Sequence, residues 1–133
     1  MVCLECGAKT AVINSRLQKR SNSVWRRRQC RKCQAIFTTQ ELPLYELAWT
    51  VKDKKGHIKP FSRDKLLISL SKSCAHRSSA LTDAASLTDT VIKRLIQEVK
   101  QSNLTSQQIK QIALVTLNRF DTPAATHYQA YHP

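Results

Sequence analysis

Four cysteines stand in two pairs whose spacing suits a metal ion. Cys3 and Cys6 form one CxxC pair, and Cys30 and Cys33 form a second pair after residues 7–29. Two residues between cysteines allow a tight turn to direct both sulfurs at one ion, and two such turns complete a tetrahedral site. Zn2+ suits a closed four-thiolate site best, although iron uses the same ligands. Redox-active pairs and disulfides are the alternatives, but a thioredoxin-like CxxC opens a helix and neither pair does.

The segments around these cysteines favour short strands. Residues 10–14, 24–29 and 36–39 are β-leaning and are separated by polar turns, which predicts a small three-stranded ribbon. So short a module carries too few apolar side chains to fold on a core of its own. We therefore expect the metal to supply the missing folding free energy.

A cluster of arginines lies between the two cysteine pairs. Arg26, Arg27 and Arg28 are consecutive, and Arg16 precedes them. Adjacent guanidinium groups repel one another unless an anion lies over them, and arginine grips phosphate oxygens with two hydrogen bonds. Trp25 beside them is able to stack on a base or a sugar. The alternative interpretation is a solvated charge run with Trp25 in the ribbon core.

The charge of the whole chain points to the same kind of partner. The formal net charge is +13, from 22 basic and 9 acidic side chains. Residues 1–80 hold 17 of the basic and 5 of the acidic side chains, so the last third is nearly neutral. A polyanion is the natural partner for such a field.

Several classes of protein are not expected. The sequence contains no run of about 18 apolar residues, so it predicts no membrane-spanning helix. The polar start of the chain does not resemble a secretory signal. We therefore expect a cytosolic protein. No nucleophile motif, paired carboxylates or HExxH sequence indicates catalysis, so we expect no enzyme. Cys74 lies on an apolar helical stripe and is expected to be a core thiol.

The chain changes character near residues 41–43. Residues 45–52 and 57–60 read as two strands joined by a turn at residues 53–56. From residue 61 the period is helical, with Ser62 as a predicted N-cap, Thr105 and Gln108 as a capping box, and Pro123 opening a last helix. We predict an α+β protein with a zinc ribbon at residues 1–47 and a hairpin plus helical bundle at residues 48–133.

Basic residues of the hairpin and the first helix suit an anionic ligand. Lys52 lies on the first strand, and Arg63 and Lys65 lie in the first helical turn, where free backbone N–H groups attract anions. No glycine-rich phosphate loop is present. Converging lysines would hold a triphosphate; a solvated basic hairpin is the alternative.

The motifs together resemble the NrdR family of bacterial transcriptional repressors, which control ribonucleotide reductase genes. The resemblance is carried by residues 3–7, 12–16, 24–33 and 37–41. It continues into an ATP-cone-like module through residues 51–52, 56, 60–61 and 64–66. Three departures from the family pattern are Asn14, where the family usually has Asp, a hairpin between Val51 and Phe61 that is about one residue longer than usual, and a shorter C-terminus.

The resemblance implies a zinc ribbon that contacts operator DNA, followed by a cone whose bound ATP or dATP sets the oligomeric state. It implies a cytoplasmic protein associated with the bacterial nucleoid. The DNA contacts would be Arg16, Arg26, Arg27 and Arg28. The nucleotide site would be lined by Val51, Lys52 and Lys65, with Lys55, Lys59 and Arg63 as further candidates.

Two other functions remain open on the sequence. One is a zinc-ribbon protein that binds RNA or associates with the ribosome and uses its helices for protein contacts. The other is a thiol oxidoreductase, which would show accessible thiols without a chelator.

Overall fold

The computed structural model describes residues 1–133 and confirms an α+β protein. The chain separates into two compact units, Met1–Pro43 and Leu44–Pro133. The sequence had suggested a boundary between residues 47 and 48. The ring of Tyr45 is buried and lies 4.4 Å from that of Trp49, so the residues just after Pro43 pack with the second unit.

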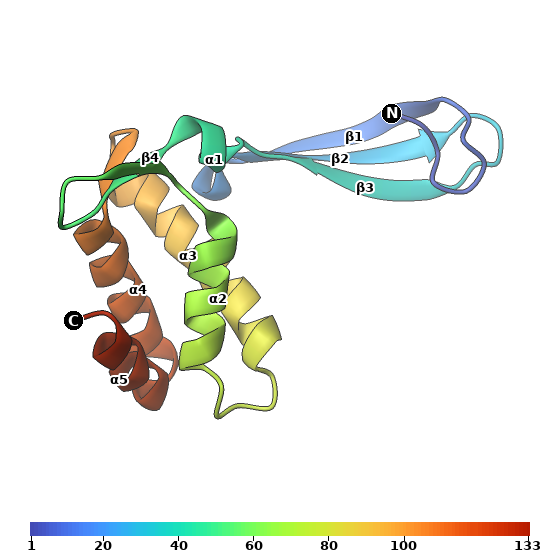
Figure 1. Cartoon of the computed structure of the whole chain (residues 1–133). Coiled ribbons are helices and arrows are strands. Elements are labelled where there is room, and N and C mark those ends of the chain that lie inside the picture. The colour runs from blue at the N-terminus through green and yellow to red at the C-terminus, as the bar shows by residue number, and fades with distance from the viewer. The chain divides into compact units, whose positions relative to one another are not determined.

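The first unit is a three-stranded antiparallel ribbon in the order β1-β2-β3 (Figure 1). Its elements are β1 (Thr10–Gln18), the 3-10 turn η1 (Lys19–Ser21), β2 (Ser23–Cys30) and β3 (Ile36–Glu41). The predicted ribbon is therefore confirmed, with a first strand longer than expected. Asn22 closes the β1–β2 connection in the left-handed conformation at φ 46°, which asparagine tolerates better than most residues.

A second small sheet opens the other unit. Strands β4 (Thr50–Lys52), β5 (Ile58–Pro60) and β6 (Asn103–Thr105) pair in the order β5-β4-β6, with β4 and β6 parallel. The sequence did not indicate β6, because three residues with a single apolar side chain show no alternation. Leu104 of this strand is nevertheless buried, opposite Val51.

The strand predicted over residues 45–52 is wrong in its first half. Tyr45–Ala48 forms the short helix α1, and the strand begins only at Thr50. Tyr45 and Trp49 are four residues apart, so one helical turn brings both rings to the same side. Trp49 then meets Phe61 edge to face at 5.4 Å. Packing of these three aromatic rings explains why the segment is helical here.

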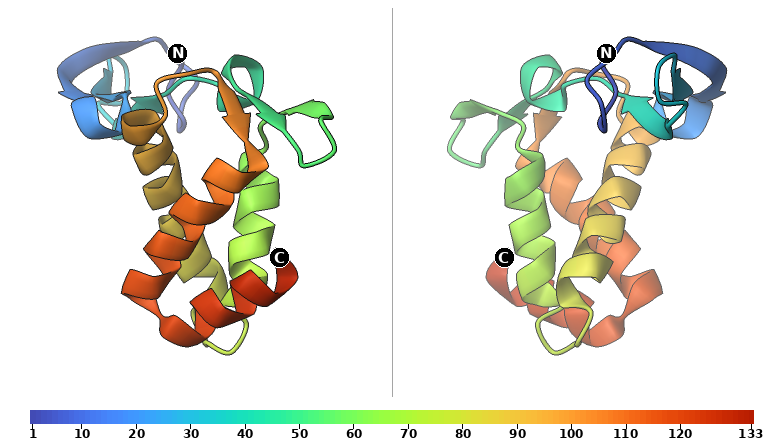
Figure 2. Two further views of the ribbon diagram at one scale, coloured as in Figure 1. Left: turned by 90° about the vertical axis from the view of Figure 1, so that its left-hand side faces the viewer. Right: turned by 90° about the vertical axis from the view of Figure 1, so that its right-hand side faces the viewer.

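Four helices build the rest of the second unit. They are α2 (Arg63–Ser73), α3 (Ala80–Glu98), α4 (Ser106–Phe120) and α5 (Thr122–Tyr131). Helix α2 packs against α3 and α5, and α4 packs against α3 and α5 (Figure 2). Their shared core is one apolar cluster that includes Leu70, Leu95 and Leu117, each fully buried.

The predicted helix starts are confirmed. The hydroxyl of Ser62 accepts the N–H of Lys65 at 3.3 Å. Thr105 and Gln108 form a reciprocal capping box, and Pro123 stands in the first turn of α5. Cys74 is completely buried in the core, as expected. No helix is both long and apolar enough to cross a membrane.

Candidate functional site

The four cysteines of the ribbon converge on one point. Their Sγ atoms all lie within 4.8 Å of one another, with Cys3 and Cys33 at 3.6 Å and Cys6 and Cys30 at 3.5 Å. Tetrahedral zinc with Zn–S bonds of about 2.3 Å separates its sulfurs by about 3.8 Å. All five cysteines of the chain are free thiols, which excludes the disulfide interpretation for this structure.

Each CxxC pair forms a turn that aims N–H groups at sulfur. The N–H of Glu5 donates to Cys3 Sγ at 3.4 Å, and the N–H of Lys32 donates to Cys30 Sγ at 3.3 Å. Each turn ends in a left-handed residue, Gly7 at φ 71° and Gln34 at φ 64°. Glycine adopts this region without strain. The side chain of Gln34 compensates by donating to the carbonyl of Arg31 at 3.3 Å.

Electrostatics in the cluster favour a bound cation. The N–H of Cys33 lowers the pKa of Cys30 to about 6, and the N–H of Lys32 adds to this while burial opposes it. Although the N–H of Ala35 acts in the opposite direction, burial and the neighbouring sulfurs raise the pKa of Cys33 to about 12. Four thiolates cannot share this space without positive charge between them. The residues fit Zn2+, which would hold all four as thiolates and fold the ribbon.

The arginines of the ribbon lie on two different faces. Cross-strand pairs connect Trp25 with Arg16 and Gln40, and Arg27 with Asn14 and Thr38. These residues share one face, which we call the Trp25 face. Its exposed members are Asn14, Arg16, Trp25, Arg27, Thr38 and Gln40.

The opposite face contains Arg26 and Arg28, which are half-buried. Arg26 forms an ion pair with Glu41, and Arg28 Nε donates to Thr39 Oγ1 at 3.4 Å. Trp25 is 48% exposed, so the interpretation that it forms the ribbon core is wrong. The ribbon is thin, and a single layer of strands has no second layer to cover the ring.

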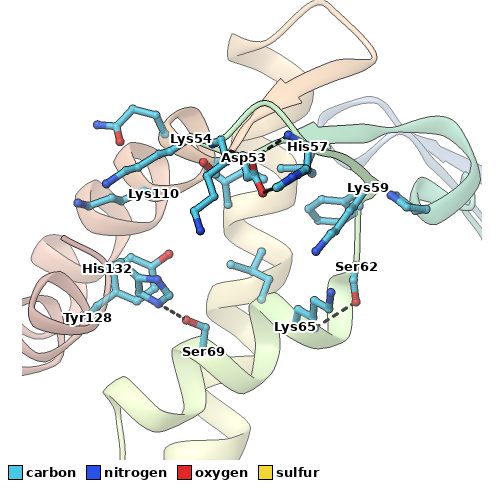
Figure 3. A pocket seen from close by; sticks show the side chains of 18 of the residues that line it. Asp53, Lys54, His57, Lys59, Ser62, Lys65, Ser69, Lys110, Tyr128 and His132 are labelled. Atoms are coloured by element: carbon cyan, nitrogen blue, oxygen red, sulfur yellow. Dashed lines mark hydrogen bonds and ion pairs between the residues drawn. The ribbon is translucent and has the colours of Figure 1, made fainter.

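A cavity of about 720 Å3 lies in the second unit (Figure 3). Volumes of this order accommodate drug-sized ligands and cofactors. Five lysines line it, and Asp53 is its only acidic side chain. These lysines are Lys54 and Lys55 of the hairpin turn, Lys59 of β5, Lys65 of α2 and Lys110 of α4.

The hairpin turn at the edge of the cavity is built around Asp53. Its carboxylate accepts the N–H groups of Lys55 and His57 at 2.8 and 2.9 Å, and His57 Nδ1 lies 3.0 Å from the second oxygen. Gly56 allows the turn because its φ is 88°. Burial opposes the effect, but these hydrogen bonds lower the pKa of Asp53. The only acidic side chain of the cavity is therefore occupied by its own turn, and the lysine charges outnumber it.

Four of the six predicted nucleotide residues line the cavity, namely Val51, Lys55, Lys59 and Lys65. The other two do not. Lys52 follows Val51 on β4, and strand alternation turns it to the other face. Arg63 Nη2 bonds Asp89 Oδ1 at 2.8 Å, which holds it against α3.

Several cavity residues were not predicted from the sequence. Lys54 and Lys110 add positive charge, and α2 and the C-terminal segment add a polar group beside them. There the Ser69 hydroxyl lies 2.6 Å from His132 Nε2, and the ring of Tyr128 lies 4.3 Å from that of His132. Burial, with Lys110 nearby, lowers the pKa of His132. No sequence motif identifies Ser69, Tyr128 and His132 as a group, because they meet only through the packing of α2 against α5.

The comparisons with known proteins agree with this organisation. Residues 1–41 match the family described as "Transcriptional repressor NrdR-like, N-terminal domain", and residues 50–132 match the ATP cone domain. The NrdR repressor of Syntrophotalea carbinolica is 32% identical over 99% of this chain and 83% of its own length. That of Streptococcus uberis is 33% identical over 90% of this chain and 77% of its own length.

The relatives are named as repressors, which is a regulatory and non-enzymatic role. Neither an RNA-binding or ribosome-associated protein nor a thiol oxidoreductase is therefore favoured. The four cysteines are able to hold the zinc of the ribbon, and the cone implies ATP or dATP as effector. With both family models matched in order along one chain, the protein belongs to the NrdR family of transcriptional repressors.

Proposed function

We propose that this chain represses ribonucleotide reductase genes in response to adenine nucleotides. The zinc ribbon binds operator DNA through its arginines, and the cavity of the cone binds ATP or dATP. The bound nucleotide sets the assembly of the chain, and the protein works in the bacterial cytoplasm at the nucleoid. The observation that carries the proposal is the lysine-lined cavity of about 720 Å3 within an ATP cone.

The cavity offers separate surroundings for the two parts of a nucleotide. Lys59 and Lys65 stand near the start of α2, where unpaired backbone N–H groups add to the attraction for phosphate. Apolar side chains of Val51, Phe61 and Ile109 are available to the base. A triphosphate held by several lysines and a base held by apolar contacts is the simplest occupant.

The test of assembly is a mass measurement of the zinc-loaded chain in solution. It is made with ATP, with dATP and with neither nucleotide. We expect the mean mass to change with the nucleotide, and to differ between ATP and dATP. An unchanged mass under all three conditions would contradict nucleotide control of assembly.

Two neighbouring cations provide a matched test of the cavity. Lys65→Ala removes a charge that lines it, whereas Arg63→Ala removes a charge paired with Asp89. Hydrogen bonds to charged groups contribute about 1.5–3 kcal/mol, so Lys65→Ala should weaken ATP binding by roughly tenfold or more in calorimetry. Arg63→Ala should bind ATP almost as the parent does. Equal losses in the two variants would place the nucleotide elsewhere.

Binding to operator DNA is tested with a duplex from the promoter of the source organism's ribonucleotide reductase genes. We expect the chain to bind it more tightly than an unrelated duplex of equal length, and with an affinity that the nucleotide alters. An RNA duplex of the same sequence serves as competitor. Preferential binding of the RNA would refute operator recognition.

A further inference from the structure

The two faces of the ribbon differ in how far their arginines are already engaged. On one face Arg26 is paired with Glu41, and Arg28 donates to Thr39. On the Trp25 face, Arg16 and Arg27 are exposed and take part in no ion pair. Two guanidinium groups on this face are therefore free for an anion.

The Trp25 face also lacks negative charge. The first unit contains only two acidic residues, Glu5 and Glu41. Glu41 pairs in register with Val24 and so lies on the opposite face. Glu5 lies in the first cysteine turn, outside the three strands. A phosphate approaching Arg16 or Arg27 over the sheet meets no carboxylate on that face.

Trp25 is placed between these two arginines. It is directly opposite Arg16 across the strands, and Arg27 is two residues further along β2 on the same face. Directly opposite residues have Cβ atoms about 4.5–5.5 Å apart, and residues two apart on a strand are about 7 Å apart. Half-exposure of so large an apolar ring is unfavourable in water. Stacking on a base or packing on a sugar would cover it.

We infer that the Trp25 face is the DNA-contacting surface, with Arg16 and Arg27 on phosphates and Trp25 on sugar or base, whereas Arg26 and Arg28 lie on the opposite face and contact Glu41 and Thr39 of β3. The inference rests on the proposed function and divides the arginine run into two roles. The Arg26–Glu41 pair is partly exposed and therefore weak, so the decisive feature is the face on which each arginine lies.

The test compares single variants of the full zinc-loaded chain on one promoter duplex over a series of salt concentrations. Each phosphate contact contributes about 0.9 to the slope of log affinity against log salt. Arg16→Ala and Arg27→Ala should each lower that slope by about one. Arg26→Ala and Arg28→Ala should leave it unchanged. A loss of slope in the second pair but not the first would overturn the inference.

Trp25 is tested by its effect on affinity at constant slope. Removal of a stacking side chain typically weakens binding by about 5- to 150-fold, so we expect a loss within this range for Trp25→Ala. Trp25→Phe keeps an aromatic face and should recover most of it. An affinity for Trp25→Ala equal to that of the parent would refute a contact between this ring and DNA.

A further variant covers the case in which Arg26→Ala does not fold, as judged by zinc content. Glu41→Gln breaks the ion pair and leaves Arg26 in place. If Arg26 lies away from DNA, freeing it does not change the salt slope, whereas a steeper slope would overturn the inference. A parent chain with no salt-dependent affinity for duplex DNA would refute the proposed function itself.

Discussion

Loss of the metal is expected to unfold residues 1–43 and to leave residues 44–133 folded. In the first unit only Cys3, Ser23 and Cys30 are buried, while Ile13 and Leu17 are 50% and 62% exposed. The strands thus have no apolar core to hold them. The second unit has a continuous buried cluster around Leu70, Leu95 and Leu117.

The expected loss of stability in the ribbon follows from this contrast. Binding of Zn2+ to a structural site contributes about 10–16 kcal/mol, which equals or exceeds the whole stability of a typical domain at about 5–15 kcal/mol. No burial in the ribbon replaces that contribution. The perturbation is Cys33→Ser, which removes one ligand at an exposed position.

The assay is hydrogen exchange of the backbone amides, read on peptide fragments together with the zinc content. We expect β1, β2 and β3 to lose protection in Cys33→Ser, while α2 to α5 keep it. Cys74→Ser is the matched control, because this thiol is buried in the second unit and lies outside the four-cysteine cluster. That variant should keep its zinc and destabilise only the second unit, by about 1–3 kcal/mol. Protected ribbon amides in metal-free protein would refute the reasoning.

Two further predictions concern the second unit. Leu70→Ala should lower the free energy of unfolding of this unit, measured in urea, by about 2–5 kcal/mol, because the Leu70 side chain is fully buried. The control variant Ile68→Ala, at a position that is 54% exposed, should change that free energy far less. Equal effects of the two variants would contradict the assigned core. The Ser79 hydroxyl, and then Arg77, lower the pKa of Asp83. A lowered pKa contributes stability that is present above about pH 4 and is lost as the pH falls through the folded value. Stability should therefore decline less between pH 5 and pH 3 in Asp83→Asn than in the parent; parallel declines would remove Asp83 from the acid response.

Local sequence determined the features that depend on a few neighbouring residues. The spacing of Cys3, Cys6, Cys30 and Cys33 predicted one cluster, since each CxxC turn is closed by its own backbone. The helix starts at Ser62 and Thr105 were likewise predictable, because a cap satisfies N–H groups only three residues away.

The lysine-lined cavity of the second unit was predictable from the sequence only in part. Lys59 and Lys65 were candidates because hairpin and helix are adjacent in the chain. Lys110 and His132 were not, because they come from α4 and the C-terminal segment. Only packing of the helices brings them to the hairpin. Arg63 shows the reverse case, since its helix-start position suited an anion but Asp89 on α3 already engages it.

For the ribbon, the sequence by itself determined that Arg27 faces away from Arg26 and Arg28, because side chains alternate along a strand. It did not determine which neighbours each arginine meets. A register shift between Val12 and Asn14 places Val12 opposite Arg28, and β3 brings Glu41 and Thr39 to the same face. Pairing between strands is decided by the tertiary structure, because a shift of one residue moves a side chain to the other face.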